Sequence, residues 1–232
     1  MTLLLRVRQN SQKYTHIYMK RPFYTVLAAQ FFSSLADNAL ILASIALLRE
    51  ILNDPRPGDT EPLLKFFFTV AYVVLAPFVG AFADSRPKGK VMFITNLIKV
   101  VGCSIMLLGV SPLMAMVIVG LGAAAYSPAK YGIVTELVPA KDLVAANGWI
   151  ETLTVLSIIF GTVLGGFLSS PGVHTWLVGH YPTWSLSPGL TAVTMICVIY
   201  GIAAFLNKMI PDSGARYRKQ HIHPVALTKE FI

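Results

Sequence analysis

The sequence has 232 residues, of which 55% are hydrophobic and only 13% are charged, and its mean hydropathy is +0.64. A soluble globular domain carries about 25% charged residues, so this composition excludes an ordinary soluble protein. The net charge of +8 would suggest nucleic-acid binding in a soluble protein, but the basic residues here fall in short segments between apolar runs. This pattern predicts a membrane protein with membrane lipids as partners and no nucleic-acid partner.

Six apolar stretches are long enough to cross a bilayer, because a hydrocarbon core about 30 Å thick needs roughly 20 helical residues. They lack the period-2 alternation of a membrane barrel. The sequence therefore predicts an all-α membrane protein, with an amino-terminal tail (1–22), a six-helix transmembrane bundle (23–211) and a linker or tail (212–232). The predicted spans are Tyr24–Leu48, Leu63–Ala83, Val91–Val110, Leu113–Val134, Gly148–Ser169 and Leu190–Ile210.

The distribution of basic residues predicts the orientation of the bundle. Both tails and the loops after the second and fourth spans are rich in lysine and arginine, whereas the opposite end has only Arg49 and Arg56. Because positive charge is enriched on the cytoplasmic side, both termini are expected in the cytoplasm. The basic residues of the predicted cytoplasmic side are Arg6, Arg8, Lys13, Lys20, Arg21, Arg86, Lys88, Lys90, Lys141, Lys208, Arg216, Arg218, Lys219 and Lys229.

The segment Pro171–Pro188 is predicted to be an outer loop. It contains Trp176, Tyr181 and Trp184, and such aromatic residues favour the headgroup level of a bilayer. The loop is therefore interpreted as an interfacial anchor. Its two histidines give no defensible metal site, and we expect neither a metal nor a cofactor.

Polar residues within the first and third spans form candidate sites, because ionisable groups inside a membrane are costly. Gln30, Ser34 and Asp37 recur at i, i+4 and i+7 and so share one helix face. Asn96 and Lys99 share a face of the third span in the same way. The estimated depths, about 20 Å for Asp37 and about 13 Å for Lys99, allow the two side chains to pair. The pair is expected either to couple solute or ion movement or to act as a structural clamp.

A second charged pair is expected nearer the cytoplasmic side. Lys130 lies near the end of the fourth span and Glu151 near the start of the fifth, at a similar depth, with Asn147 one turn before Glu151. This pair is interpreted either as a gate or as a salt bridge that stabilises the bundle. Gly161 and Gly165 of the fifth span form a GxxxG pattern, which favours close helix packing.

The loop after the second span carries a recognisable motif. The sequence Gly80-Ala81-Phe82-Ala83-Asp84-Ser85-Arg86-Pro87-Lys88-Gly89-Lys90 resembles the cytoplasmic signature of the major facilitator superfamily. In this interpretation Gly80 permits close packing, Asp84 pairs with cations or faces the positive end of a helix, and Gly89 permits a tight turn. Arg86 and Lys90 are expected to hold the loop at the anionic leaflet.

Further segments narrow the resemblance to the bacterial lysophospholipid transporter family. These segments are residues 28–40, 76–80, 120–132 and 145–148 with Glu151 following. The resemblance covers about Ala28–Pro211. It implies a flippase of the bacterial inner membrane that moves lysophosphatidylethanolamine and related lipids from the outer to the inner leaflet, where an acyltransferase re-acylates them.

The resemblance also implies a fold of two three-helix repeats with inverted topology and transport by alternating access. The expected substrate- or ion-binding residues are Gln30, Ser34, Asp37, Asn38, Asn96, Lys99 and Tyr126. The residues expected at a cytoplasmic gate or in ion pairs are Gly80, Asp84, Arg86, Gly89, Lys90, Lys130, Asn147 and Glu151.

Members of that family have twelve spans, whereas this chain has six predicted ones. The chain is therefore expected to need a carboxy-terminal half or a second copy as a partner. The alternatives are a half that is non-functional alone and a facilitator half with a different small-molecule substrate. A membrane enzyme is disfavoured, since no acid–base pair, nucleophile–base pair or metal spacing is evident.

Overall fold

The computed structural model describes residues 2–53, 60–181, 183 and 185–215, and this part of the chain contains helices but no strands. Several residues used in the predictions lie outside the described part: Arg56, Trp184, Arg216, Arg218, Lys219 and Lys229. The helices are α1 (Thr2–Leu52), α2 (Thr60–Asp84), α3 (Lys88–Leu107), α4 (Pro112–Leu137), the short 3-10 helix η1 (Ala140–Asp142), α5 (Leu143–Leu168), α6 (Pro171–His180) and α7 (Pro188–Lys208).

Five helices, or six with a bent one, are long and apolar enough to cross a membrane. The five are α3, α4, α7, the part of α1 from Arg21 to Leu52, and α5 together with η1. The sixth is α2, whose segments Pro62–Val74 and Phe78–Asp84 meet at an angle of 68°. With α2 counted as one span, the structure agrees with the predicted six-span bundle.

Two predicted irregular segments are helical. Most of the predicted tail belongs to α1, which begins at Thr2 and continues through Pro22. The segment predicted as an outer loop contains α6, which begins at Pro171. The side chain of Ser170 caps α6 by accepting a hydrogen bond from the backbone N–H of Val173 at 3.5 Å. A proline at the first helical position and a serine before it are favourable helix-start residues.

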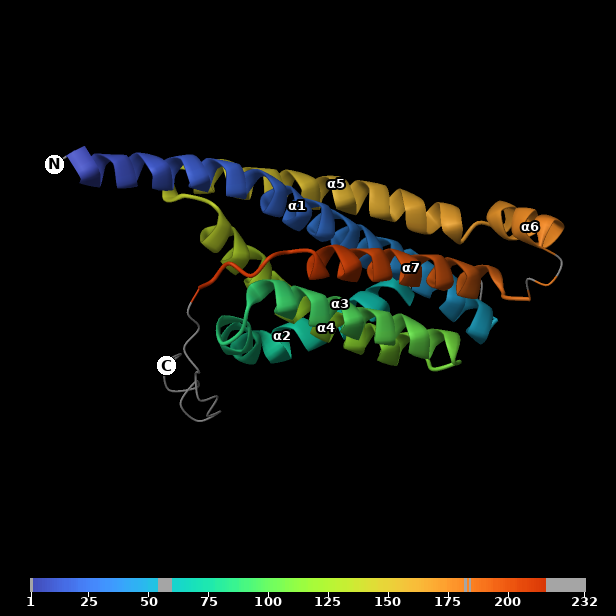
Figure 1. Cartoon of the computed structure of the whole chain (residues 1–232). Helices are drawn as coiled ribbons and strands as arrows, with labels where there is room; N and C mark the ends of the chain where they lie inside the picture. Colours follow the sequence, from blue (N-terminus) through green and yellow to red (C-terminus); the bar gives the residue numbers. More distant parts are fainter. Residues whose placement is uncertain (1, 54–59, 182, 184, 216–232) are drawn as a thin grey trace.

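The helices form two layers (Figure 1). One layer contains α1, α5 and α7, and the other contains α2, α3 and α4. Helix α1 packs against α5 and α7, helix α4 packs against α2 and α3, and α3 packs against α7 across the layers. The same contacts result when α1 is exchanged with α4, α2 with α5 and α3 with α7. The pattern fits the expected pair of three-helix repeats.

Glycines allow the backbones of α1 and α5 to meet closely. A Cβ atom added at Gly161 would lie 2.5 Å from the carbonyl oxygen of Leu35, and one at Gly165 would lie 2.5 Å from the carbonyl oxygen of Ala39. Similarly, a Cβ at Gly120 of α4 would lie 2.5 Å from a backbone oxygen of α2. Because a side chain at these positions would separate the helices, the packing interpretation of the GxxxG pattern is confirmed.

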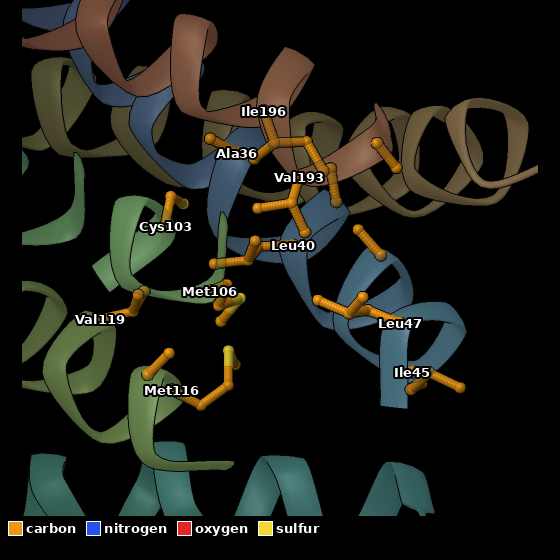
Figure 2. Close-up of a cluster of buried hydrophobic side chains, with 14 of the residues drawn as sticks. Ala36, Leu40, Ile45, Leu47, Cys103, Met106, Met116, Val119, Val193 and Ile196 are labelled. Atoms are coloured by element: carbon orange, nitrogen blue, oxygen red, sulfur yellow. The ribbon is translucent and has the colours of Figure 1, made fainter. Parts of the chain in front are cut away.

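Buried apolar side chains form two clusters at different levels of the bundle. The larger cluster joins α1, α3, α4 and α7 (Figure 2), and it includes Leu40, Met106, Met116 and Ile196. The second cluster lies nearer the α2–α3 loop and includes Val26, Met92, Ile133 and Ile150, among others. Buried polar residues of α1 and α3 also lie within the bundle.

Candidate functional site

A cavity of about 240 Å³ lies between α1, α2, α4 and α5, with one residue contributed by α3. Its volume is somewhat below the range of about 300–1,000 Å³ that is usual for small-molecule sites. The lining is mostly polar or aromatic, which is unusual inside an otherwise apolar bundle. The residues that line it are Gln30, Ser33, Ser34, Asp37, Asn38, Ile41, Phe68, Tyr72, Lys99, Ala123, Tyr126, Ser127, Lys130, Thr154 and Ile158.

Asp37 and Lys99 form an ion pair at one side of this cavity. The Nζ atom of Lys99 lies 2.8 Å from Oδ2 of Asp37, so the predicted pairing of the two residues is confirmed. The side chain of Lys99 is 1% exposed and that of Asp37 is 21% exposed. Tyr200 of α7 donates a hydrogen bond to Oδ1 of Asp37 at 2.6 Å. The carboxylate therefore connects α1 to both α3 and α7.

The rings of two tyrosines flank the same ammonium group. The Nζ atom of Lys99 lies 5.1 Å from the ring centroid of Tyr126 and 5.5 Å from that of Tyr200. A cation within about 6 Å of an aromatic ring face is attracted by the ring quadrupole. The predicted site residue Tyr126 thus contributes a buried aromatic surface to the cavity.

Ser33 extends the polar network from Lys99 toward Asn96. Lys99 donates to the hydroxyl of Ser33 at 3.0 Å, and Ser33 donates to Oδ1 of Asn96 at 2.8 Å. Asn96 is fully buried and does not line the cavity, and its Nδ2 atom has no hydrogen-bond acceptor among the described residues. Asn96 therefore lies behind Ser33, away from the cavity lining.

The remaining predicted residues of α1 face the cavity. Gln30 donates to the hydroxyl of Thr154 at 3.1 Å, which links α1 to α5. Ser34 and Asn38 also line the cavity, and Asn38 donates to the carbonyl of Ser34 at 2.8 Å. The i, i+4, i+7 spacing of the polar residues in α1 thus correctly predicted a shared polar face.

Sequence reasoning missed several cavity residues. Tyr72 of α2 donates to the hydroxyl of Ser127 in α4 at 2.8 Å, and both line the cavity, as does Thr154. Tyr200 was missed as the second partner of Asp37. Tyr72 and Tyr200 lie in apolar runs, where a tyrosine gives no indication of its polar partner. Ser127 and Thr154 had a readable signal, because Ser127 lies three residues before Lys130 and Thr154 lies three residues after Glu151.

The predicted ion pair between Lys130 and Glu151 is wrong. Tyr131 separates the two charges, since its hydroxyl donates to Glu151 at 2.6 Å and its ring centroid lies 4.4 Å from Nζ of Lys130. Lys130 is buried and lines the cavity, whereas Glu151 is exposed. Asn147 is exposed as well and does not line the cavity. Similar depth in the membrane did not determine which way the side chains point.

A buried lysine, Lys88, begins α3 directly after the loop that follows α2. The Nζ atom of Lys88 lies 2.6 Å from a carboxylate oxygen of Asp84 and donates to the carbonyl of Ala83 at 2.8 Å. The expected pairing of Asp84 with a cation is thus confirmed. The guanidinium of Arg86 lies 4.5 Å from the ring centroid of Phe82. Lys90 is exposed at the start of α3.

The two glycines of this loop motif differ from their predicted roles. Gly89 lies inside the first turn of α3, so it forms no tight turn. A Cβ at Gly89 would lie 3.3 Å from the side chain of Ile210, which shows that the residue gives room to the segment after α7. No described atom lies within 4 Å of a Cβ added at Gly80, so its predicted close packing is not present in the described part of the chain.

Helix α6 presents aromatic residues at the opposite end of the bundle. Trp176 is 56% exposed and its ring centroid lies 4.5 Å from that of His180. An apolar cavity of about 560 Å³ lies where α6 meets the end of α5, and Met195 of α7 also lines it. The described residues contain no group of three His, Cys, Asp or Glu residues that could hold a metal ion.

Comparison with known proteins identifies the family. The sequence model described as Major Facilitator Superfamily matches residues 26–230. The chain belongs to this superfamily. The match includes the signature loop and every helix that lines the cavity. The chain is therefore part of a multi-pass membrane transporter family, in agreement with the resemblance found in the sequence.

Curated members of the superfamily are similar along almost the whole chain. The chain is 39% identical over 214 residues to the protein named Lysophospholipid transporter LplT of Yersinia enterocolitica, and 38% identical to those of Pectobacterium carotovorum and Yersinia pestis. Each match covers 92% of this chain and 48% of the relative. The chain thus spans about half the length of the curated relatives it matches. Their names are those of transporters and not of enzymes.

A solved structure supports the fold. It is the crystal structure of a bacterial homolog of the human lysosomal transporter Spinster, in an inward-facing and unoccupied conformation. The TM-score is 0.62 at 15% sequence identity, over 87% of this chain and 45% of that chain. The six-span bundle therefore has the fold of a part of a major facilitator, about half of the whole.

Proposed function

We propose that the chain is the amino-terminal half of a lysophospholipid transporter, which moves lysophosphatidylethanolamine-like lipids from the outer to the inner leaflet of a bacterial inner membrane. The observation that carries this proposal is the polar cavity with its buried Asp37–Lys99 pair, in a chain similar along 92% of its length to proteins named lysophospholipid transporters. A polar cavity inside an apolar bundle suits the head group of such a lipid.

The proposed substrate contacts are the polar residues of α1 and α4 that face the cavity. Gln30, Ser34, Asn38 and Asp37 present amide, hydroxyl and carboxylate groups, and Tyr126 adds an aromatic surface. A lysolipid also carries an acyl chain, which would lie along apolar residues of the lining such as Ile41, Phe68 and Ile158. The one-sided arrangement of polar and apolar groups matches an amphipathic substrate.

The second half of the transporter would pack against α2 and α5. In α5, only 22% of the most apolar stretch is buried inside the bundle, compared with 44–61% for the other four straight spans. Exposed apolar residues of α5 include Val155, Ile159, Val163 and Phe167, and those of α2 include Phe66, Val70, Val73 and Val74. Because these two helices flank the cavity, a half placed against them would form its opposite wall.

The proposal includes an orientation with both termini in the cytoplasm. The α2–α3 loop, with Arg86 and Lys90, would then lie at the anionic inner leaflet. Transport in this direction delivers the lysolipid to the leaflet where a cytoplasmic acyltransferase can act on it. Labelling of single cysteines placed in the α2–α3 loop and in α6, with a membrane-impermeant thiol reagent on intact cells, tests this orientation.

Uptake of labelled lysophosphatidylethanolamine into proteoliposomes tests the function. The samples are this chain alone, this chain co-reconstituted with the carboxy-terminal half of the Yersinia enterocolitica relative, and the complete relative as the positive control. Saturable uptake that requires the chain and is lost in Asp37→Asn supports the proposal. Active flux in the complete relative, together with no flux in any sample that contains this chain, contradicts it.

A further inference from the structure

Lys130 is a buried cation that no carboxylate of the described residues contacts. It lies on α4 one turn beyond Tyr126, lines the central cavity and is only 6% exposed. Its ammonium contacts the face of the Tyr131 ring, at 4.4 Å from the centroid. No carboxylate or hydrogen-bond acceptor among the described residues contacts it. Lys99 differs, because Asp37 neutralises it.

The carboxylate that could have neutralised Lys130 is engaged elsewhere. Glu151 accepts the hydroxyl of Tyr131 and lies on the exposed side of α5. The cavity lining therefore contains two ammonium groups, Lys99 and Lys130, against the single carboxylate of Asp37. Glu151 attracts Lys130 without contacting it. A buried charge without a contacting partner is unfavourable, so the excess of positive charge in the lining favours an anionic ligand.

Hydroxyl groups lie beside this cation in the same lining. Ser127 is almost one helical turn before Lys130, and it already accepts a hydrogen bond from Tyr72 at 2.8 Å, so its own proton is available to a ligand. Thr154 also lines the cavity, but its proton is donated to the carbonyl of Ile150 at 2.8 Å. A lysine ammonium and the hydroxyl donor of Ser127 suit the oxygens of a phosphate, which accept several hydrogen bonds and carry negative charge.

From this arrangement we infer that Lys130 binds the phosphate of the lysophospholipid head group. The inference rests on the proposed function and deepens it, because it gives Lys130 the role of a substrate-binding residue and not of an ion-pair partner. Every lysoglycerophospholipid carries this phosphate, whatever alcohol is attached to it. The site therefore selects acylglycerols that carry a phosphate and discriminates against monoacylglycerols, which lack one.

Equilibrium binding to the full chain, purified in detergent and captured on scintillation beads, tests the inference. The probes are radiolabelled oleoyl-lysophosphatidylethanolamine and radiolabelled monooleoylglycerol, which have the same acyl chain and differ in the phosphate. The variants are Lys130→Met, Lys130→Arg and Lys141→Gln. Met replaces a buried ammonium with an apolar chain of similar length, so we expect it to fold. Lys141 is an exposed lysine beyond the end of α4 and serves as the matched control.

The expected result is a loss of affinity for the phosphate lipid of about 10- to 100-fold in Lys130→Met, as for one charge-assisted hydrogen bond. Its affinity for monooleoylglycerol should be unchanged, Lys130→Arg should restore most of the binding, and Lys141→Gln should match the wild type. Equal loss for both lipids, or no loss for the phosphate lipid, overturns the inference. If Lys130→Met fails to fold, the wild type decides: equal affinity for the two lipids overturns the inference, and a preference of tenfold or more for the phosphate lipid supports it.

Two further outcomes separate this inference from the proposed function. A wild-type chain that binds neither lipid contradicts the proposed function itself, whereas one that binds both equally contradicts only the role of Lys130. Inorganic phosphate at millimolar concentration, added as a competitor, distinguishes a lipid phosphate from a free anion. If the lysolipid stays bound in the presence of phosphate, the lipid is the ligand of the site. If inorganic phosphate displaces the lysolipid, the assignment of the site to the lipid is overturned.

Discussion

The Asp37–Lys99 pair should make the two residues strongly interdependent for stability. The atoms Oδ2 and Nζ are 2.8 Å apart, and the lysine side chain is 1% exposed. Replacing Asp37 by Asn leaves the ammonium of Lys99 buried among neutral groups, namely Ser33 and the rings of Tyr126 and Tyr200. Replacing Lys99 by Met in the same protein removes the charge that had lost its partner. The second substitution should therefore be much less harmful after the first.

The size of this coupling follows from the geometry. Two unit charges at the observed 2.8 Å attract each other by about 6 kcal/mol at an effective dielectric constant of about 20. Breaking one member of a buried pair typically costs about 3–5 kcal/mol, whereas replacing both members with apolar or neutral groups is often close to neutral. We therefore expect a coupling energy of about 3–5 kcal/mol between Asp37→Asn and Lys99→Met.

A double-mutant cycle measures the coupling directly. The free energy of unfolding would be obtained in mixed micelles with increasing dodecyl sulfate, for the wild type, both single variants and the double variant. The pair Asp84–Lys88 is the matched control, because the side chain of Asp84 is 62% exposed. An exposed carboxylate predicts a coupling of about 1 kcal/mol or less. A coupling at Asp37–Lys99 no larger than at this control would refute the reasoning.

Three other substitutions test the packing and the hydrogen bonds of the bundle. Gly165→Ala should lower the free energy of unfolding by about 1–3 kcal/mol more than Gly166→Ala, and should therefore melt at a lower temperature. A Cβ at 165 would lie 2.5 Å from a backbone oxygen, whereas one at 166 would lie 3.8 Å from a side chain. Equal melting temperatures would contradict this. Glu50→Gln should destabilise the amino-terminal end of α7 by about 1–3 kcal/mol, since the carboxylate accepts the backbone N–H of Gly189 at 2.8 Å, and faster amide exchange there is the readout. Tyr131→Phe should cost at most about 1 kcal/mol in thermal unfolding, because it removes an exposed hydrogen bond and keeps the ring beside the lysine; a larger loss would show that the hydroxyl itself holds α4 and α5 together.

The sequence predicted the large features of the fold because they depend on averages over many residues. Apolar runs of about 20 residues defined the spans whatever their packing partners were. Helical spacing likewise predicted the polar face of α1, and depth predicted the Asp37–Lys99 pair, since a long lysine side chain reaches its partner over a wide range of helix rotations.

The predictions that failed depended on the direction of single side chains. Lys130 and Glu151 have similar depths, but the rotations of α4 and α5 place Tyr131 between their charges. Tyr200 could not be predicted as a partner of Asp37, because a tyrosine in an apolar run carries no information about its rotation. Tertiary packing sets these directions, and a single sequence does not encode them in a readable pattern.

The two missed helical segments have different causes. Helix α6 had a readable signal in Ser170 and Pro171, which are favourable residues for a helix start, but its aromatic content had favoured an interfacial loop. The extension of α1 toward Thr2 had none, because Pro22 usually marks a helix boundary and the residues before it are mixed in polarity.

The buried lysine at the start of α3 restricts which substitutions this fold can accept. A Cβ at Gly132 of α4 would lie 2.8 Å from Cε of Lys88, whose ammonium is held by the carbonyl of Ala83 and the carboxylate of Asp84. A larger residue at 132 would pull that ammonium away from both acceptors. The side chain of Lys88 and the space at Gly132, more than 40 positions apart in the chain, therefore depend on each other. Substitutions at 88 and 132 should be tolerated in combination more readily than singly, because a shorter side chain at 88 makes room for a larger one at 132 where α2, α3 and α4 meet.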